Sequence, residues 1–254
     1  MPVSGRVMIV GLGPGPAEWM TPEASAAVAS ATDVVGYGPY VERLALRTDQ
    51  RVHASDNRVE MDRACLALKL ATQGRAVAVV SGGDPGVFAM AAAVFEAIET
   101  DPQWLKIDVA VAPGVTAMQA AAARLGAPLG HDFCAISLSD NLKPWAIVER
   151  RLCAACDGDF VIALYNPAST ARPVRITQAF DLLRNVKAPA TPVAFARAVG
   201  RADETLTLTT LGEADTSRID MATLVIIGSS ETRFIARDGT WAWMLTPRAY
   251  GGGR

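Results

Sequence analysis

The sequence predicts an α/β protein of two α/β domains, with a mostly parallel sheet in the first domain and a mixed sheet in the second. In the first half, apolar runs of strand length alternate with longer runs of helical spacing, the pattern of a parallel sheet flanked by helices. In the second half, one run alternates apolar and polar residues, as a half-exposed antiparallel strand does. The predicted domains are residues 1–128 and 129–245, followed by a disordered tail at 246–254.

Capping residues mark several boundaries in the first half. Thr21 is the expected N-cap of the first helix, because its hydroxyl can accept from a free helical N–H and Pro22 suits the first helical position. Gly74 and Gly126 are the expected ends of two later helices, since glycine readily adopts the left-handed conformation that closes a helix. The expected strands are residues 6–12, 33–37, 76–81 and 106–113, and the expected helices are residues 22–31, 60–73, 86–99 and 115–125.

The second half has the same strand and helix signals in a different arrangement. The run ETLTLTTL at 204–211 alternates with period two and is therefore the expected antiparallel strand. The other expected strands are residues 133–139, 159–166, 192–199 and 222–229, and the expected helices are residues 144–156 and 174–186.

Composition excludes several classes of function. Half of the 254 residues are apolar, which is enough for a sizeable core, and the net charge of −2 argues against a general nucleic-acid binder. No apolar run approaches the roughly 20 residues of a membrane helix, and the N-terminus lacks the pattern of a signal peptide. We therefore expect a cytoplasmic protein with neither a membrane nor a nucleic acid as partner.

Cysteine and histidine usage predicts no metal site. Cys153 and Cys156 form a C-x-x-C motif, but it lies in a helix-like run, and a second pair of zinc ligands at suitable spacing is not visible. We interpret these cysteines as reduced structural thiols. The alternative is a redox-active or cluster-binding role.

Three turns rich in small residues each follow a strand-like run and precede a helix-like run. They are VGLGPGP at 10–16, SGGDPGVF at 81–88 and VAPGVTA at 111–117. Open α/β sheets bind ligands at the edge where such turns lie. The first turn does not match a dinucleotide fingerprint, because Pro16 stands where the third glycine is required. Asp84 in the second turn either caps the following helix or helps the turn to hold a ligand.

Five motifs along the chain resemble the tetrapyrrole methylase family. They are GLGPG at 11–15, GYGPYVERL at 36–44, SGGDPGVF at 81–88, VAPGVTA at 111–117 and LYNPASTAR at 164–172. The resemblance covers essentially the whole chain and implies an S-adenosylmethionine-dependent methyltransferase acting on a tetrapyrrole. GYGPYVE and NPASTAR are most similar to members that act in cobalamin biosynthesis, methylating one ring carbon and contracting the macrocycle.

The resemblance also implies where the ligands bind. The methyl donor is expected in a cleft between the two domains, and a homodimer is expected because family members commonly form one. Asn166 stands where relatives often have methionine. The positions that match the family's donor site are Pro14, Gly82, Gly83, Asp84, Val87, Phe88, Thr116, Ala117, Asn166, Ala194 and Ala196.

The tetrapyrrole substrate carries many carboxylates, which arginine binds well through paired hydrogen bonds. Cations in or beside the candidate loops are Arg43, Arg58, Lys143, Arg172, Arg175 and Arg197. Arg172 is our choice among them, because it follows the YNPAST turn, and Ser139 and Tyr37 are further candidates for substrate binding.

Ring contraction adds acid–base work to methyl transfer. His131 is a candidate because histidine titrates near neutrality, although a structural role is the alternative for a lone histidine. Asp140 and Tyr165 are the other catalytic candidates.

Three rival interpretations remain open. The chain is alternatively a relative that acts at another ring carbon or on the cobalt-containing intermediate. A nucleotide-dependent oxidoreductase on a Rossmann-type sheet is a second alternative, against which Pro16 argues. A carrier that binds a tetrapyrrole without transforming it is the third.

Overall fold

The computed structural model describes residues 5–57, 59–168 and 174–251. The chain divides into two compact units, the first ending at Ala117 and the second beginning at Met118. The division lies ahead of the expected boundary at residue 128, because the helix at 117–125 groups with the second unit. The two units are described one at a time.

The first unit contains a fully parallel sheet of five strands in the order β3-β2-β4-β1-β5. The strands are β1 (Arg6–Gly11), β2 (Asp33–Tyr37), β3 (Arg51–Ser55), β4 (Ala76–Ser81) and β5 (Asp108–Ala112). The predicted parallel sheet is confirmed. The sequence signals missed β3, since this edge strand is largely exposed and has no apolar run.

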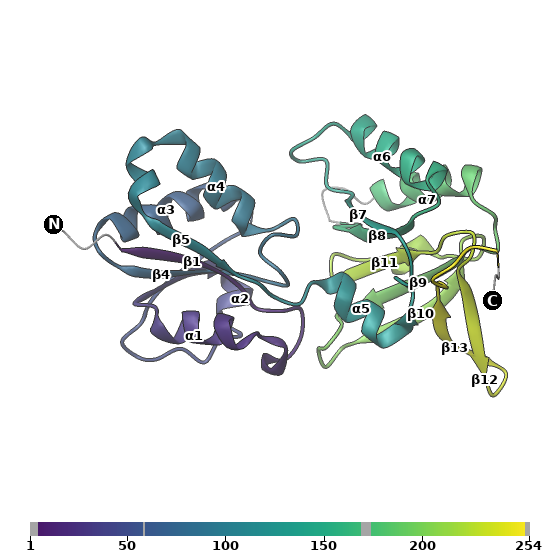
Figure 1. The fold of residues 1–254 in the computed structure, drawn as a ribbon, viewed down its shortest axis with the longest axis horizontal. Helices are drawn as coiled ribbons and strands as arrows, with labels where there is room; N and C mark the ends of the chain where they lie inside the picture. Colours follow the sequence, from purple (N-terminus) through teal and green to yellow (C-terminus); the bar gives the residue numbers. More distant parts are fainter. Residues whose placement is uncertain (1–4, 58, 169–173, 252–254) are drawn as a thin grey trace. The chain divides into compact units, whose positions relative to one another are not determined.

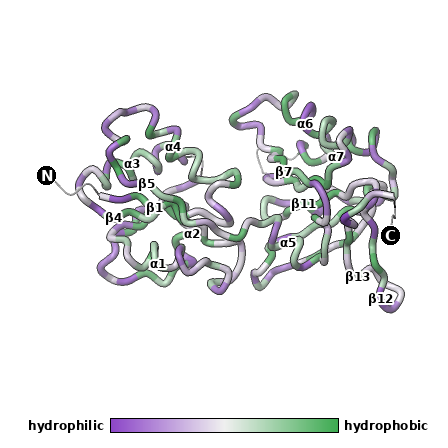
Figure 2. The backbone as a smooth tube through the Cα atoms, viewed as in Figure 1, coloured by the Kyte–Doolittle hydropathy of each residue, from purple (hydrophilic) through white to green (hydrophobic). Residues whose placement is uncertain are grey.

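Helices cover both faces of the first sheet, with α3 and α4 on one side and α1 on the other (Figure 1). Alternate residues of β1 supply the two cores: Val7 and Ile9 pack on the α3/α4 side, and Met8 and Val10 on the α1 side. Figure 2 shows the resulting hydrophobic character of β1. The helices are α1 (Pro22–Ser30), α2 (Gly38–Val41), α3 (Glu60–Thr72) and α4 (Met90–Thr100), with 3-10 turns at Ala17–Trp19 and Pro102–Lys106.

The expected caps are present, but one helix begins late. The Thr21 hydroxyl accepts from the Ala24 N–H at 3.1 Å, and Gly74 has a φ of +81° at the end of α3. The helix expected from residue 86 starts only at Met90, because the segment after β4 is a turn in which Phe88 has a φ of +54°.

The second unit contains a mixed sheet of five strands in the order β10-β9-β11-β8-β7. Only β7 and β8 pair in parallel, while the other pairs are antiparallel, including the predicted β10 with β9. The predicted mixed sheet is confirmed. The strands are β7 (Phe133–Ser137), β8 (Val161–Tyr165), β9 (Pro192–Arg197), β10 (Thr205–Thr210) and β11 (Thr223–Ile227).

Helices α6 (Trp145–Asp157) and α7 (Arg175–Val186) cover one face of this sheet (Figure 1). Leu152 of α6 and Phe180 of α7 are fully buried against inward residues such as Ile162 of β8. The unit also contains α5 (Ala117–Leu125), a 3-10 turn at Thr216–Arg218, and a small sheet of β6 (Gly126–Ala127), β12 (Arg233–Arg237) and β13 (Thr240–Leu245). Within the described residues, no helix has the length and apolar character to cross a membrane.

The end of the chain corrects one prediction. Thr246 is buried, and its hydroxyl donates to the Pro128 carbonyl oxygen at 2.6 Å. The Tyr250 hydroxyl donates to the Asp159 carboxylate at 3.1 Å. The prediction of a disordered tail is therefore wrong for residues 246–251, while residues 252–254 lie outside the described residues. Both contacts join residues far apart in the sequence, so no local pattern reveals them.

Asp33 is a fully buried carboxylate at the start of β2. His53 Nε2 lies 2.8 Å from its Oδ1, and both the Thr32 hydroxyl and the Arg75 guanidinium donate to its Oδ2. Burial alone raises the pKa of this carboxyl, but hydrogen bonds from His53, Thr32 and Arg75 outweigh burial, and the pKa is lowered. The ionised form of Asp33 therefore stabilises the fold.

Replacing Asp33 with asparagine should lower the free energy of unfolding at pH 7 by about 3 kcal/mol, as when one partner of a buried ion pair is removed. Because the folded pKa lies below the unfolded value of about 3.9, this stabilisation is complete above about pH 5 and is lost as the pH falls through the folded pKa. Urea unfolding of the wild type and Asp33→Asn at several pH values measures the difference in the free energy of unfolding. The control Asp49→Asn, in an exposed pair with Arg47, should have little effect. A pH-independent loss for Asp33→Asn would contradict the assignment.

Candidate functional site

Two turns at the carboxyl edge of the first sheet are joined through their backbones. The Gly13 N–H, after β1, donates to the Gly83 carbonyl, after β4, and the Gly83 N–H donates back to the Gly13 carbonyl, both at 3.1 Å. The Leu12 N–H also donates to the Ser81 carbonyl at 2.9 Å. The turns that follow β1 and β4 thus stay paired beyond the parallel strands, through an antiparallel bridge between Gly13 and Gly83.

Asp84 joins the turn after β4 to the turn after β5. Its Oδ1 accepts from the Gly86 N–H at 2.8 Å, and its Oδ2 accepts from the Gly114 N–H at 3.0 Å. Both carboxylate oxygens are thus used by backbone donors. The contact with the Gly86 N–H is the one expected of the capping alternative for Asp84, although α4 itself begins only at Met90.

Glycine is required in these turns for two different reasons. A Cβ on Gly114 would lie 2.3 Å from the Gly83 oxygen, and one on Gly82 would lie 2.7 Å from the Tyr40 ring, so close packing excludes a side chain at both positions. Gly83 instead has a φ of +70°, and a Cβ there would meet no atom nearer than 3.9 Å. Glycine is therefore required at position 83 by the left-handed backbone, since a Cβ there would make only ordinary van der Waals contacts with residues 115–117.

The structure places the predicted ligand residues of the first unit in the segments that follow neighbouring strands. Phe88 combines a φ of +54° with a half-exposed side chain, an uncommon backbone conformation of the kind that clusters at functional sites. Tyr37 ends β2, and its ring packs edge-on against Tyr40 with the centroids 5.3 Å apart. The predicted residues that lie at this edge are Pro14, Tyr37, Gly82, Gly83, Asp84, Val87, Phe88, Thr116 and Ala117.

A second group of predicted residues lies at the carboxyl ends of β7 and β8 in the second unit. The buried Ser137 hydroxyl accepts from Asn166 Nδ2 at 3.0 Å and from the Ser139 N–H at 3.3 Å. Asn166 has a φ of +50°, so the chain turns sharply after β8. The Tyr165 hydroxyl accepts from the Met118 N–H in α5 at 3.0 Å. Ser137 is a residue that the sequence signals missed, because it lies inside a strand rather than in a turn.

The cations near these turns are engaged within the protein. Arg175 pairs with Asp140, its Nε lying 2.7 Å from Oδ2, and its guanidinium lies 4.7 Å from the Trp145 ring centroid. Lys143 Nζ donates to the Ser139 carbonyl at 2.9 Å. Arg58 and Arg172, our choice for substrate binding, lie outside the described residues.

The two alanines that the resemblance assigns to the donor site, Ala194 and Ala196, lie on β9, and both are buried. Ala194 and Ala196 alternate along β9 with Val193 and Phe195, which belong to the core under α6 and α7. The two alanines therefore point to the opposite face of the second sheet.

His131 lies away from the other catalytic candidates. It precedes β7, whereas Asp140 follows β7 and Tyr165 ends the parallel β8, so His131 lies at the opposite edge of the sheet. The five residues of β7 separate these edges, at about 3.3 Å per residue. His131 is therefore an alternative to Asp140 and Tyr165 as the acid–base residue, at a separate place in the unit.

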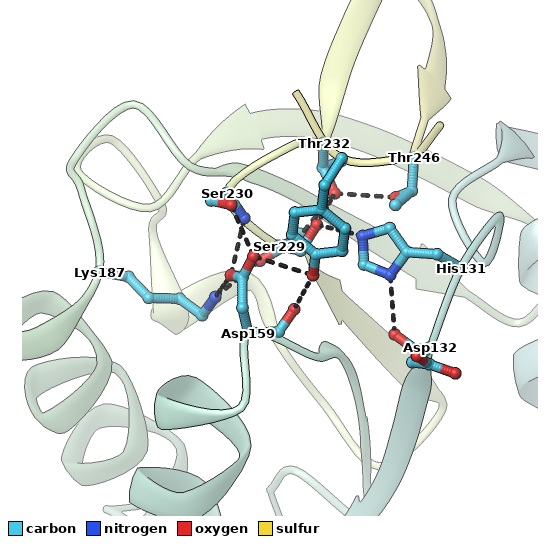
Figure 3. A network of polar contacts seen from close by, with 10 residues as sticks. His131, Asp132, Asp159, Lys187, Ser229, Ser230, Thr232 and Thr246 are labelled. Carbon is cyan, nitrogen blue, oxygen red and sulfur yellow. Dashed lines mark hydrogen bonds and ion pairs between the residues drawn. The ribbon is translucent and has the colours of Figure 1, made fainter. Parts of the chain in front are cut away.

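The surroundings of His131 are those of a structural residue (Figure 3). Its Nε2 lies 2.9 Å from the Ser229 hydroxyl, and its ring stacks on Tyr250 with the centroids 5.0 Å apart. Asp159 in the same network accepts from Ser230 and Tyr250. Burial raises the pKa of Asp159, but these hydrogen bonds and Lys187 outweigh it, and the pKa is lowered.

All four cysteines carry free thiols. Burial, with a smaller contribution from Cys156, raises the pKa of Cys134 to about 11 despite the nearby Lys187. Burial also raises the pKa of Cys156. Both thiols are therefore protonated at neutral pH, and a protonated thiol is a weak nucleophile; Cys156 is one of the two cysteines of the C-x-x-C motif. Among the described residues, no cluster of three metal-ligating side chains is present.

A family model described as Tetrapyrrole (Corrin/Porphyrin) Methylases matches residues 6–215 of the chain. The chain belongs to the tetrapyrrole methylases. The family membership and the fold class that the sequence predicts are thus confirmed.

Two relatives of nearly equal length and one solved structure are similar to this methylase. A Sinorhizobium sp protein named precorrin-3B C(17)-methyltransferase is 58% identical over 251 residues, covering 98% of this chain and 99% of the relative. A Salmonella typhimurium protein named probable cobalt-factor III C(17)-methyltransferase is 44% identical over 243 residues, covering 95% of this chain and 98% of the relative. The crystal structure of the methyltransferase CobJ matches with a TM-score of 0.92 and 50% identity, covering 96% of this chain and 100% of that chain.

The packing of the turns in this methylase predicts a stability difference. In Gly114→Ala, the new methyl group overlaps the Gly83 oxygen, so the free energy of unfolding should fall by about 1–3 kcal/mol. In Gly38→Ala, no atom lies within 4 Å of the new methyl group, and the change should stay within about 0.5 kcal/mol. Denaturant unfolding of both variants measures the difference. Equal stabilities would contradict the close approach of the two turns.

Proposed function

We propose that this methylase transfers a methyl group from S-adenosylmethionine to C17 of precorrin-3B, contracting the macrocycle to precorrin-4 in cobalamin biosynthesis. The observation that carries the proposal is the 58% identity, over almost the full length of both chains, to the protein named precorrin-3B C(17)-methyltransferase. The match to CobJ at 50% identity supports the same activity.

Methyl transfer from a sulfonium donor makes specific demands on the protein. The donor supplies an activated methyl group, so the chain has to align donor and acceptor and exclude water. Alignment of two reactants can supply about 7–11 kcal/mol of barrier reduction. Rigid turns that bring backbone close to a ligand suit this task, and the turns after β1, β4 and β5 are held by mutual hydrogen bonds.

We infer that the donor contacts the turns of the first unit, and we carry forward the residues that match the family's donor site. The left-handed backbone of Gly83 and the half-exposed, left-handed Phe88 fit a turn that binds a small molecule. Asp84 contributes by holding its turn, since both its oxygens accept from backbone N–H groups. The residues proposed to hold the donor are Pro14, Gly82, Gly83, Val87, Phe88, Thr116, Ala117, Asn166, Ala194 and Ala196.

The proposed substrate residues are Tyr37, Ser139 and Arg172. Tyr165 and Asp140 remain the proposed acid–base residues, and His131 is left out because it lies at the other edge of its sheet. The Tyr165 hydroxyl is positioned by the Met118 N–H, and the Asp140 carboxylate by Arg175.

The proposal also includes a homodimer and a cytoplasmic location. Light scattering tests the homodimer, and cell fractionation tests the location.

A second candidate substrate is the cobalt-containing intermediate of the same pathway. It is favoured by the 44% identity to the protein named probable cobalt-factor III C(17)-methyltransferase. Both names describe methylation at C17, so the same donor site is proposed for either substrate.

Incubation with S-adenosylmethionine and either precorrin-3B or cobalt-factor III, followed by mass spectrometry and absorption spectroscopy, tests the proposal. We expect precorrin-3B to gain one methyl group and its chromophore to change with ring contraction. Turnover of cobalt-factor III alone would favour the second candidate. Donor binding without turnover of either substrate would point to another ring carbon, and tetrapyrrole binding without turnover to a carrier.

Gly83→Val should weaken binding of S-adenosylmethionine at least about tenfold, because the side chain fills the space beside the turn. The matched control is Gly239→Val in the β12–β13 hairpin. Gly239 has a φ of +78°, close to the +70° of Gly83, and likewise has no atom within 3.5 Å of a new Cβ. Both variants should lose similar stability, but only Gly83→Val should lose donor affinity in calorimetry. Unchanged affinity in folded Gly83→Val would overturn the proposed placement of the donor.

A further inference from the structure

We propose that Arg43 is a positioning residue for methyl transfer, because it holds the Gly13–Gly15 turn that carries Pro14; the proposal rests on the function proposed above. Arg43 follows α2, after β2. Its Nη2 donates to the Gly13 carbonyl at 3.2 Å and to the Gly15 carbonyl at 2.6 Å. One guanidinium nitrogen thus contacts the backbone on both sides of Pro14.

This contact links two segments at the carboxyl edge of the sheet whose strands are separated by β4. In the strand order β3-β2-β4-β1-β5, β4 lies between β2 and β1, so the segment after β2 and the turn after β1 are not neighbours through strand pairing. Arg43 makes a direct bond between them. Its long side chain therefore adds a link that the sheet itself does not provide.

The turn itself offers few hydrogen-bond donors. Pro14 and Pro16 have no N–H to donate, and Gly13 and Gly15 have no side chains. The Gly13 carbonyl that accepts from Arg43 also accepts from the Gly83 N–H at 3.1 Å. Arg43 therefore bonds to the junction between the turns after β1 and β4, where the donor is proposed to bind.

The charge and shape of arginine suit this role. A charged donor makes a shorter and stronger hydrogen bond to a carbonyl than a neutral one, in agreement with the 2.6 Å contact to Gly15. Lysine carries a compact point charge on a flexible stem and lacks the planar fork of donors, so Arg43→Lys should hold the turn less well. Glutamine at this position would lack both the charge and the reach.

Arg47 provides a matched control. It is a similarly exposed arginine four positions later, and its guanidinium also donates to two backbone carbonyls, those of Ala29 and Ala31. Those carbonyls lie at the end of α1 and before β2, at the amino edge of the sheet. Arg47→Gln therefore removes the same kind of contact away from the proposed site.

Steady-state kinetics with S-adenosylmethionine and the accepted tetrapyrrole tests the role in catalysis. Arg43→Gln should lower kcat about 10- to 100-fold, as small misplacements of reacting groups do, while KM for the donor stays within about threefold. Arg43→Lys should recover part of kcat, and Arg47→Gln should retain the wild-type values. Wild-type kcat in Arg43→Gln, or an equal loss in Arg47→Gln, would overturn the proposal.

Hydrogen exchange separates this inference from the proposed function, because it needs no substrate. The Gly13 and Gly83 amides, which bond to each other's carbonyls, should exchange faster in Arg43→Gln than in the wild type, and Arg47→Gln should not change them. If the wild type methylates neither tetrapyrrole, the proposed function fails, and the exchange rates still show whether Arg43 holds the turn. Unchanged exchange at both amides would overturn the inference.

Discussion

The backbone bonds between the turns after β1, β4 and β5 are the constraint on which the candidate site of the first unit depends. Gly13 and Gly83 exchange hydrogen bonds, and Asp84 adds a bond to Gly114. These links require glycine where backbones approach closely, as at Gly114. They also require the three strands to be neighbours in the sheet, which the strand order supplies. The edge thus becomes one rigid backbone surface.

Several arginines among the described residues bind other parts of the same chain. Arg43 holds backbone carbonyls, Arg175 holds Asp140, and Arg197 pairs with Asp203 and Asp220. Methyl transfer from a sulfonium donor requires the donor and the acceptor to be aligned. Arginines that fix turns and side chains within the protein contribute to that alignment. The sequence suggests arginines as binders of substrate carboxylates, but for Arg43 and Arg175 the structure shows bonds within the protein.

Local signals predicted most of the elements because they act over a few residues. The Thr21 cap, the Gly74 terminus and the alternation of β10 each depend on neighbours in the chain. The late start of α4 was missed because the turn through Phe88 has a left-handed residue that a helical pattern does not reveal. The edge strand β3 was missed because it is largely exposed and lacks an apolar run.

By itself, the sequence determined the α/β class, the family and the motifs of the candidate site, because strand periodicity, caps and turn residues are written in neighbouring positions. Only the tertiary structure decided which side chains meet. It separated His131 from Tyr165 by the length of β7, and it joined Arg43 to the Pro14 turn across β4. Strand order and the two edges of a sheet arise from pairing between distant segments, and one chain's local pattern does not specify that pairing.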